Sequence, residues 1–234
     1  MIYVTSDLHG YPLDCFQALL RRAGFGDRDF LFVLGDVIDR NGDGGVEMLR
    51  WMMVQPNVQL ILGNHEAMLL ACDFLFDEIT EDSLARLTTD QMAALADWMA
   101  NGATPTLETL RALNKKDREA VADVLDYLRD APLYDTVSLE NGDFLLTHSG
   151  LDNFAPERGL DDYAPDELLW CRPDPEQRYF GQVTTVLGHT PTDAYGAPGR
   201  AFHPPTWIDI DTGAAQGRAP MLLRLDDLKE FYIC

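Results

Sequence analysis

Cysteine, histidine and basic residues are scarce in this 234-residue chain. The four cysteines form no C-x-x-C pair, so neither a zinc knuckle nor a disulfide scaffold is indicated. Eighteen Lys and Arg stand against 39 Asp and Glu, which gives a formal net charge of −21. A protein this acidic lacks the basic face that nucleic acid and anionic membranes require. No apolar run approaches the length that spans a bilayer.

These absences give expectations about location and partners. Met1 leads straight into an apolar segment with no basic residues before it, so we expect no secretory signal and a cytoplasmic protein. We expect no nucleic-acid partner and no membrane partner. The oligomeric state is left open, and a monomer is compatible with the sequence. With 46% hydrophobic residues, the chain can form one α/β domain over residues 1–234 that carries an insertion.

The few histidines are concentrated in motifs at predicted strand ends. Four of the five lie in segments rich in Asp, Asn and Gly: Asp7-Leu8-His9, Gly63-Asn64-His65-Glu66, Thr147-His148-Ser149-Gly150 and Gly188-His189-Thr190. A fifth motif, Gly35-Asp36-Val37-Ile38-Asp39-Arg40, has no histidine. Each motif directly follows an apolar run typical of a buried strand, at residues 2–5, 30–34, 58–62, 144–147 and 183–187. Because ligands bind at the carboxyl ends of strands in open α/β sheets, the five loops should converge on one site.

The order of the predicted elements favours an α/β sandwich. Strands and helices alternate in the first third of the chain, which is typical of a largely parallel sheet. Residues 75–131 show helical periodicity that begins at Leu84 and predict a helical insertion that covers one side of the site. Trp98, within this pattern, is expected to be a core residue. Strands dominate afterwards, beginning with a hairpin whose turn is predicted at Asn141-Gly142. Residues 153–182 are expected to be mostly loop.

The motif side chains suit two divalent metal ions. Carboxylate, imidazole and amide donors favour manganese, iron or zinc, whereas a soft site would need the cysteines. Asp7 and His9 are two residues apart, so in an extended strand end they would point to the same side and bind one ion. Asp36 could bridge this ion to a second. The second ion would be completed by ligands from later motifs: Asn64, His148 and His189. Two ions about 3.5–4 Å apart activate a water for in-line displacement at phosphorus.

Together the five motifs resemble the ordered signature of the phosphoprotein phosphatase family of metallophosphoesterases. The likeness is greatest to its compact bacterial and bacteriophage serine/threonine phosphatases, such as lambda phosphatase. It runs from residue 1 to about Gly213, and five motifs in order with matching spacing are specific. The resemblance implies a calcineurin-like sandwich of two mixed β-sheets flanked by helices, with the insertion at about 75–131.

The resemblance also implies the metal ligands. The first ion takes three of them: Asp7, His9 and the bridging Asp36. The second ion takes four: Asp36, Asn64, His148 and His189. We expect Mn²⁺ first, with iron or zinc as alternatives.

Roles in binding and proton transfer follow from the same resemblance. Arg40 and Arg172 bind phosphate oxygens, to which each planar guanidinium can donate two parallel hydrogen bonds, and Asn64 also contacts the phosphate. His65 protonates the leaving alkoxide, and Asp39 holds it through a carboxylate–imidazole hydrogen bond.

Three positions depart from the family pattern without removing a ligand. Ser6 stands where the family has glycine before the first aspartate, and Ser149 where it has glycine after His148. Asn41 replaces the glycine after Arg40, and we expect it to preserve the turn because asparagine tolerates a left-handed backbone.

The leading hypothesis is a phosphomonoesterase that hydrolyses phosphoserine and phosphothreonine in a phosphoprotein or phosphopeptide. The nearest alternative is a symmetrical diadenosine tetraphosphate hydrolase of the same superfamily. Glu66 favours the phosphatase, since such hydrolases more often have Asp there. A catalytically silent metal-binding interaction module is a remote alternative, because such a module need not keep His65 and Asp39.

Overall fold

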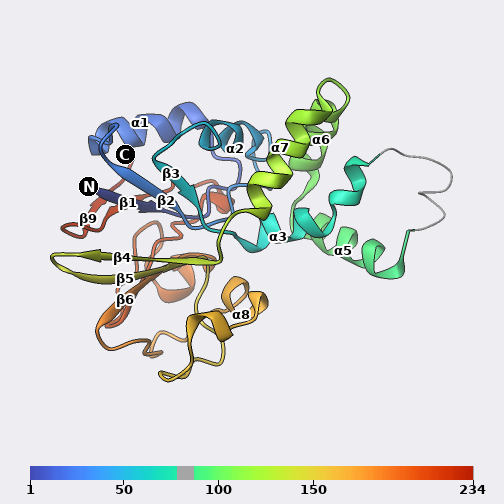
Figure 1. The fold of residues 1–234 in the computed structure, drawn as a ribbon. Coiled ribbons are helices and arrows are strands. Elements are labelled where there is room, and N and C mark those ends of the chain that lie inside the picture. The colour runs from blue at the N-terminus through green and yellow to red at the C-terminus, as the bar shows by residue number, and fades with distance from the viewer. Residues whose placement is uncertain (78–86, 234) are drawn as a thin grey trace.

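Two β-sheets that face each other form the centre of the computed structural model, which describes residues 1–77 and 87–233 (Figure 1). The first sheet has the strand order β3-β2-β1-β8-β9, with bounds β1 Ile2–Thr5, β2 Phe30–Val33, β3 Val58–Leu60, β8 Leu222–Arg224 and β9 Lys229–Phe231. The second has the order β4-β5-β6-β7, with bounds β4 Tyr134–Leu139, β5 Gly142–Thr147, β6 Val183–Leu187 and β7 Trp207–Asp209. Each sheet contains parallel and antiparallel pairs, so the predicted α/β sandwich of two mixed sheets is confirmed.

Helices α1 (Leu13–Ala23) and α2 (Val46–Met52) connect the parallel strands and lie over the first sheet (Figure 1). Pro12 precedes α1, whose apolar face buries Phe16, Leu19 and Leu20. The helix ends at Gly24, where φ is 80°, a left-handed conformation that glycine adopts without strain.

A shared apolar core joins the two sheets. Val4 and Phe32 from the first sheet are buried in one cluster with Leu146, Val186 and Ile208 from the second. Burial of each such side chain contributes about 1.5–3 kcal/mol. This packing holds the strand ends of both sheets in fixed relative positions, and the motif loops begin there.

The predicted insertion is helical in its described part. It contains η1 (Asp73–Phe76), α5 (Thr89–Ala100), α6 (Thr104–Asn114) and α7 (Arg118–Arg129), and α3 (Asn64–Ala71) precedes it. Thr88 caps α5 by accepting a hydrogen bond from the Gln91 amide at 3.1 Å, and Asp117 caps α7 in the same way. Leu84, where the helical periodicity was predicted to begin, lies outside the described residues.

Two smaller predictions differ in detail. The hairpin loop is Glu140-Asn141 rather than Asn141-Gly142, because Leu139 pairs directly with Gly142, which is the first residue of β5. The expected loop over 153–182 contains η2 (Leu160–Asp162) and α8 (Pro165–Leu169).

Two further short 3-10 helices, η3 (Thr192–Tyr195) and η4 (Ala214–Gln216), follow later in the chain. Among the described residues, no helix is long and apolar enough to cross a membrane.

Candidate metal centre and phosphate pocket

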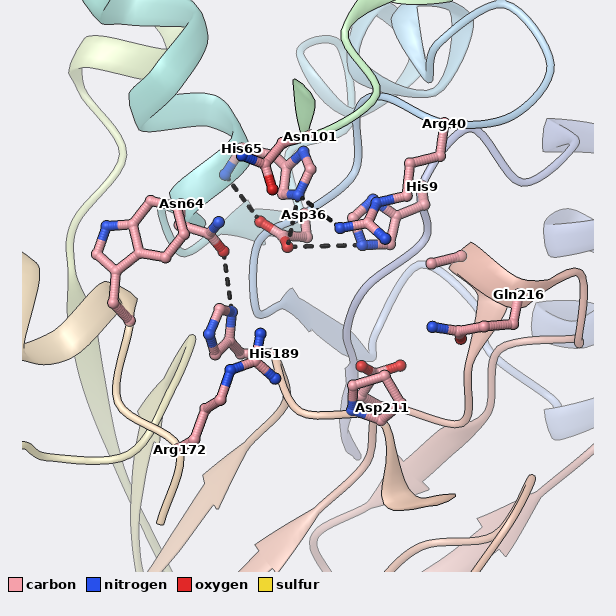
Figure 2. A pocket seen from close by; sticks show the side chains of 13 residues that line it. His9, Asp36, Arg40, Asn64, His65, Asn101, Arg172, His189, Asp211 and Gln216 are labelled. Atoms are coloured by element: carbon pink, nitrogen blue, oxygen red, sulfur yellow. Dashed lines mark hydrogen bonds and ion pairs between the residues drawn. The ribbon is translucent and has the colours of Figure 1, made fainter. Parts of the chain in front are cut away.

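Four of the five motif loops line a pocket of about 260 Å³, and the His148 loop lies behind it (Figure 2). Seven of the ten predicted site residues line it: His9, Asp36, Arg40, Asn64, His65, Arg172 and His189. The other three, Asp7, Asp39 and His148, are buried and bond or approach the lining residues from behind. The structure therefore brings all ten predicted residues to one place.

Left-handed turns, rather than extended strand ends, aim the motif side chains. Asp7 and His9 have φ of 52° and 43°, and β1 ends at Thr5, so the expected extended geometry is wrong. The two side chains still approach each other, with His9 Nε2 at 3.9 Å from Asp7 Oδ1. Asp36 and His189 are also left-handed, with φ of 53° and 68°. Such conformations are costly for residues other than glycine and cluster at functional sites, where the surrounding structure maintains them.

Close contacts leave no room for side chains at two glycines in the motifs. A Cβ at Gly35 would lie 2.4 Å from the Gly63 Cα. A Cβ at Gly188 would lie 2.2 Å from Asp7 Oδ2. Both glycines let loops from different strands touch, which is what assembles one site from separate segments.

Asp36 lies between two imidazoles whose protonation is fixed by backbone carbonyls. His9 Nδ1 donates to the Ile38 carbonyl at 3.0 Å, and His148 Nδ1 donates to the Leu34 carbonyl at 2.6 Å. Each neutral ring therefore presents a lone pair at Nε2. These lone pairs face opposite oxygens of Asp36: His9 Nε2 is 3.6 Å from Oδ2, and His148 Nε2 is 3.4 Å from Oδ1.

Acceptors that face one another without a hydrogen between them repel, and a cation relieves the repulsion. Asp7 Oδ1 and His189 Nε2 are also buried without a hydrogen-bond partner among the described residues. Asn64 Oδ1 lies 2.8 Å from His148 Nε2. The same oxygen lies 3.0 Å from His189 Nδ1 (Figure 2). The donor set thus fits two hard or borderline divalent ions that share Asp36.

The electrostatics of the site agree with this fit. Burial raises the pKa of Asp7 well above its ordinary value, and the neighbouring Asp211 raises it further. Burial lowers the pKa of His148 to about 3 and that of His189 to about 2. The imidazoles are therefore neutral at physiological pH, as metal coordination requires. A divalent cation would also offset the mutual repulsion of the buried carboxylates.

His65 and Asp39 form a buried pair beside this cluster. His65 Nδ1 donates to Asp39 Oδ2 at 2.6 Å, since a carboxylate can only accept. His65 Nε2 then accepts from Arg40 Nη2 at 3.2 Å and lies 3.8 Å from Asp36 Oδ2 (Figure 2). The second distance also makes His65 a geometric candidate to bind a metal together with His9 and Asp36. The Asp39 bond, which leaves Nε2 toward the pocket, instead favours proton transfer.

The two predicted phosphate-binding arginines are exposed at the pocket. Neither Arg40 nor Arg172 forms an ion pair with a carboxylate in the part of the chain that the structure describes. Both line the same pocket as Asp36. In a chain of net charge −21, two guanidinium groups without acidic partners are available to an anionic ligand.

Glu66 has a structural role. Its buried carboxylate accepts backbone hydrogen bonds from Asp36 and Gly63 at Oε2, at 2.8 and 3.1 Å, and from Val37 and Ile38 at Oε1, at 2.8 and 3.2 Å. It ties the loop after β2 to the start of α3. Glu66 therefore does not touch the substrate pocket, and its identity does not discriminate between substrates by direct contact.

The departures from the family pattern are accommodated by hydrogen bonds. Asn41 is not left-handed, so the reason expected for its tolerance is wrong. Its Nδ2 instead donates to the His9 carbonyl at 3.0 Å and to the Ala214 carbonyl at 3.2 Å. Ser6 donates to Asp7 Oδ2, and Ser149 donates to the Leu168 carbonyl at 2.7 Å.

Several pocket residues were not predicted from the sequence. Asn101, Trp170, Asp211 and Gln216 line the pocket. Trp98, expected only as core, is fully buried and also donates to Asp39 Oδ2 at 2.8 Å. Asn101 and Trp98 come from α5 and its end, which confirms that the insertion covers one side of the site.

A comparison of the chain with protein families agrees with the geometry of the pocket. The family model for calcineurin-like phosphoesterases matches residues 1–207. The chain belongs to this family. It is therefore a metallophosphoesterase-type hydrolase with residues placed to bind divalent metal.

Curated relatives share a name that concerns dinucleotides. The symmetrical bis(5'-nucleosyl)-tetraphosphatase of Acidovorax sp. (strain JS42) is 30% identical over 187 residues, which cover 80% of this chain and 51% of that protein. The protein of the same name from Chromohalobacter salexigens is 28% identical, with 95% of this chain and 94% of that protein covered. The chain spans about half the length of the first of these relatives.

Solved structures with similar folds have varied names. One assigned provisionally as a diadenosine tetraphosphatase has a TM-score of 0.60 at 18% identity, covering 99% of this chain and 92% of that one. A protein serine/threonine phosphatase from Saccharomyces cerevisiae with similarity to human PP5 has a TM-score of 0.59 at 17% identity, covering 100% and 80%. At these identities the likeness shows the fold alone.

Proposed function

We propose that this protein hydrolyses symmetrical dinucleoside tetraphosphates, such as diadenosine tetraphosphate, into two nucleoside diphosphates. The exposed arginines Arg40 and Arg172 are the main evidence for a phosphate substrate. They line one pocket with Asp36, and neither forms an ion pair with a carboxylate among the described residues. The choice of a tetraphosphate is supported by the names of the curated relatives. It replaces phosphoprotein as the first candidate substrate.

The site residues divide the work as follows. Asp7, His9 and Asp36 would hold one ion, and Asp36, Asn64, His148 and His189 would hold the second. When bound, the two ions supply an activated water and neutralise charge on the reacting phosphate. Arg40 and Arg172 bind phosphate oxygens and orient the chain of phosphates. We also propose that the ions are Mn²⁺ and that residues 1–234 act as one domain, because both sheets contribute to this pocket and share a core.

Trp170 supports a substrate that carries a base. It lines the pocket, is 40% exposed, and sets its ring edge-to-face on His189 with ring centroids 5.9 Å apart. An exposed indole face next to Arg172 gives a purine a surface on which to stack. Phosphoserine and phosphothreonine have no planar group of their own.

A phosphoserine or phosphothreonine phosphatase is the second candidate, and the His65–Asp39 pair favours it. Splitting a tetraphosphate expels a phosphate oxygen, whose conjugate acid has a pKa of about 6. An alkoxide is far more basic and needs a proton as it leaves. An imidazole that a carboxylate holds at 2.6 Å through Nδ1 and that carries a second proton on Nε2 is most useful for that leaving group.

The test compares four substrates with the manganese-loaded protein: diadenosine tetraphosphate and phosphoserine, phosphothreonine and phosphotyrosine peptides. We expect the highest kcat/KM for the tetraphosphate, with ADP as the only nucleotide product. A higher kcat/KM for phosphoserine would instead establish the second candidate. Formation of AMP and ATP would contradict symmetrical cleavage.

Trp170→Ala tests the proposed base contact separately. We expect KM for diadenosine tetraphosphate to rise about tenfold, as the loss of one stacking contact does, while p-nitrophenyl phosphate turnover stays unchanged. Leu228→Ala is the matched control, because Leu228 is also partly exposed, at 43%, and lies outside the pocket. An unchanged KM in Trp170→Ala would show that no base stacks there.

A further inference from the structure

The carboxylate of Asp39 is held mainly by residues of the helical insertion. It is fully buried and accepts three side-chain hydrogen bonds. Oδ2 accepts from His65 Nδ1 at 2.6 Å and from Trp98 Nε1 at 2.8 Å, and Oδ1 accepts from the Thr106 hydroxyl at 2.5 Å. Thr106 Oγ1 in turn accepts the Asp39 backbone N–H at 3.0 Å. Two of the three donors thus come from a segment about 60 residues away in sequence.

Trp98 and Thr106 lie on either side of a tight turn that is docked on the Asp39 loop. Trp98 is in the last turn of α5, and Thr106 is in the first turn of α6. Between them, the Gly102 carbonyl accepts the backbone N–H of Arg40 at 3.0 Å. A Cβ at Gly44 would lie 2.2 Å from the Thr106 amide nitrogen, so the two loops touch directly.

We propose that Trp98 and Thr106 are positioning residues for proton transfer: they fix the plane of the Asp39 carboxylate and thereby the direction in which His65 presents Nε2. This inference rests on the proposed phosphohydrolase function, and its effect is largest for substrates whose leaving group needs a proton, such as alkyl phosphates. The insertion thus contributes hydrogen-bond donors to the catalytic pair as well as covering the site.

The geometry explains why both donors are needed. A carboxylate can rotate about its Cβ–Cγ bond, and a donor on each oxygen prevents that rotation. Trp98 shares Oδ2 with His65, so its N–H sets where this oxygen lies, while Thr106 secures the other oxygen. If either donor is lost, the acceptor for His65 Nδ1 can shift, and Nε2 then turns away from the pocket. Hydrogen bonds to charged groups are strong enough that this loss should be measurable.

The test uses Trp98→Phe and Thr106→Val, which each remove one side-chain donor to the Asp39 carboxylate. Thr106→Val keeps the side-chain volume but also removes the acceptor of the Asp39 backbone N–H, whereas Trp98→Phe leaves a cavity. For manganese-loaded protein, we expect kcat for alkyl phosphates such as phosphoserine peptides to fall about tenfold to a hundredfold. We expect kcat for p-nitrophenyl phosphate to fall less than about twofold, because its phenolate leaves without a proton. KM and metal content should stay unchanged. Thr106→Ser keeps the hydroxyl group, so this variant should keep most of the rate that Thr106→Val loses.

Trp207→Phe is the matched control, since Trp207 is also a fully buried indole with one hydrogen bond, to the Gln177 carbonyl at 3.2 Å. It lies in β7, away from Asp39, so it should lower stability without changing the ratio of the two rates. Equal losses on alkyl and aryl phosphates in Trp98→Phe, or a ratio like that of Trp207→Phe, would overturn the positioning role.

A spectroscopic readout separates this inference from the proposed function. The His65 Nδ1–H proton, hydrogen-bonded to Asp39, should give a downfield proton NMR signal that disappears in Asp39→Asn. Trp98→Phe and Thr106→Val should shift this signal, and Trp207→Phe should leave it in place. If the signal is unmoved in both site variants, the inference fails whatever the substrate. If it shifts while every substrate of the panel is inert, the proposed function fails and the positioning role stands.

Discussion

On the Asp39 side of the pocket, both carboxylate oxygens accept hydrogen bonds from protein side chains, and Glu66 accepts four more from backbone amides. On the Asp7 side, Asp7 Oδ1 and His189 Nε2 have no partner in the part of the chain that the structure describes. Both sides are buried. The same kinds of groups are therefore satisfied by the fold in one half of the site and left for a ligand in the other.

This contrast separates what folding builds from what metal binding completes. Buried polar groups without partners lower stability, so they are found in proteins where a bound ligand interacts with them. The acid side should form in the metal-free protein, whereas the Asp7 side should be under repulsive strain until cations bind. The predictions below aim to change one side at a time.

The largest effect should come from Asp36, which faces both imidazole lone pairs. We expect parent protein to bind close to two divalent ions per chain and to lose activity in chelator, with manganese restoring it best. Asp36→Asn should abolish activity and reduce metal content more than Asn64→Ala does, because Asn64 reaches only the His148 and His189 side. Elemental analysis and turnover measure both. A stoichiometry near one, or parent-like metal content and turnover in Asp36→Asn, would contradict the bridge.

The next largest effect should come from His65, on the Asp39 side of the pocket. His65→Asn should slow phosphoserine peptide hydrolysis by about two to four orders of magnitude, yet affect p-nitrophenyl phosphate much less. Asp39→Asn should show a milder form of the same pattern, since Asp39 only orients and charges the imidazole. The measurement is kcat for both substrates, with metal content alongside. Equal losses on both substrates, together with a lost ion, would show instead that His65 binds metal with His9 and Asp36.

Glu66→Gln tests whether the loops around Asp36 depend on protein hydrogen bonds. The amide side chain would place an N–H group against backbone donors that now face a carboxylate. We expect a loss of about 2 kcal/mol or more in the free energy of unfolding, and a similar loss in metal-free protein. Denaturant unfolding with and without chelator measures it. If the loss vanishes in the metal-free state, Glu66 supports metal binding rather than the fold.

Much of the site could be predicted from the sequence because its ligands follow strands directly. His9, Asn64 and His189 lie at strand ends, so local order alone places them at one edge of the sandwich. The reach of Trp98 and Thr106 to Asp39 could not be predicted, because it depends on how a helical hairpin docks 59 and 67 residues away in the chain. A buried Trp at helical spacing looks like any core residue.

The backbone conformation of the motif loops also could not be predicted from the sequence. Asp7 and His9 reach the cluster through left-handed turns, and Asn41 acts through its side-chain amide rather than through its backbone. Both results depend on contacts between loops of different strands, such as the approach of Gly35 to Gly63. Pattern alone gives the order of such loops but not their dihedral angles.

The smallest expected effect concerns the loop before Trp170 and Arg172, which the protein holds by an ion pair at the surface. Arg158 Nη2 lies 2.6 Å from Glu167 Oε2, and Glu167 also accepts from the Ala164 amide at 2.9 Å. The Arg158 guanidinium lowers the pKa of Glu167 to about 2. This value lies below the ordinary 4.5, so the bridge stabilises the fold above pH 4.5, and its contribution is lost as the pH falls toward 2.

Glu167→Gln should therefore lower Tm by a few degrees at most at pH 7, because ion pairs that water still reaches in part contribute little. The difference in Tm between parent and variant should shrink as the pH is lowered from 4.5 to 3. Aryl phosphate turnover at pH 7 should be unchanged, since the bridge touches no reacting atom, while KM for diadenosine tetraphosphate should rise slightly if the loop aims Trp170 and Arg172. A Tm difference that grows toward pH 3 would have the wrong sign for this bridge. An unchanged KM would show that the residues of the loop, once folded, are placed by their own packing.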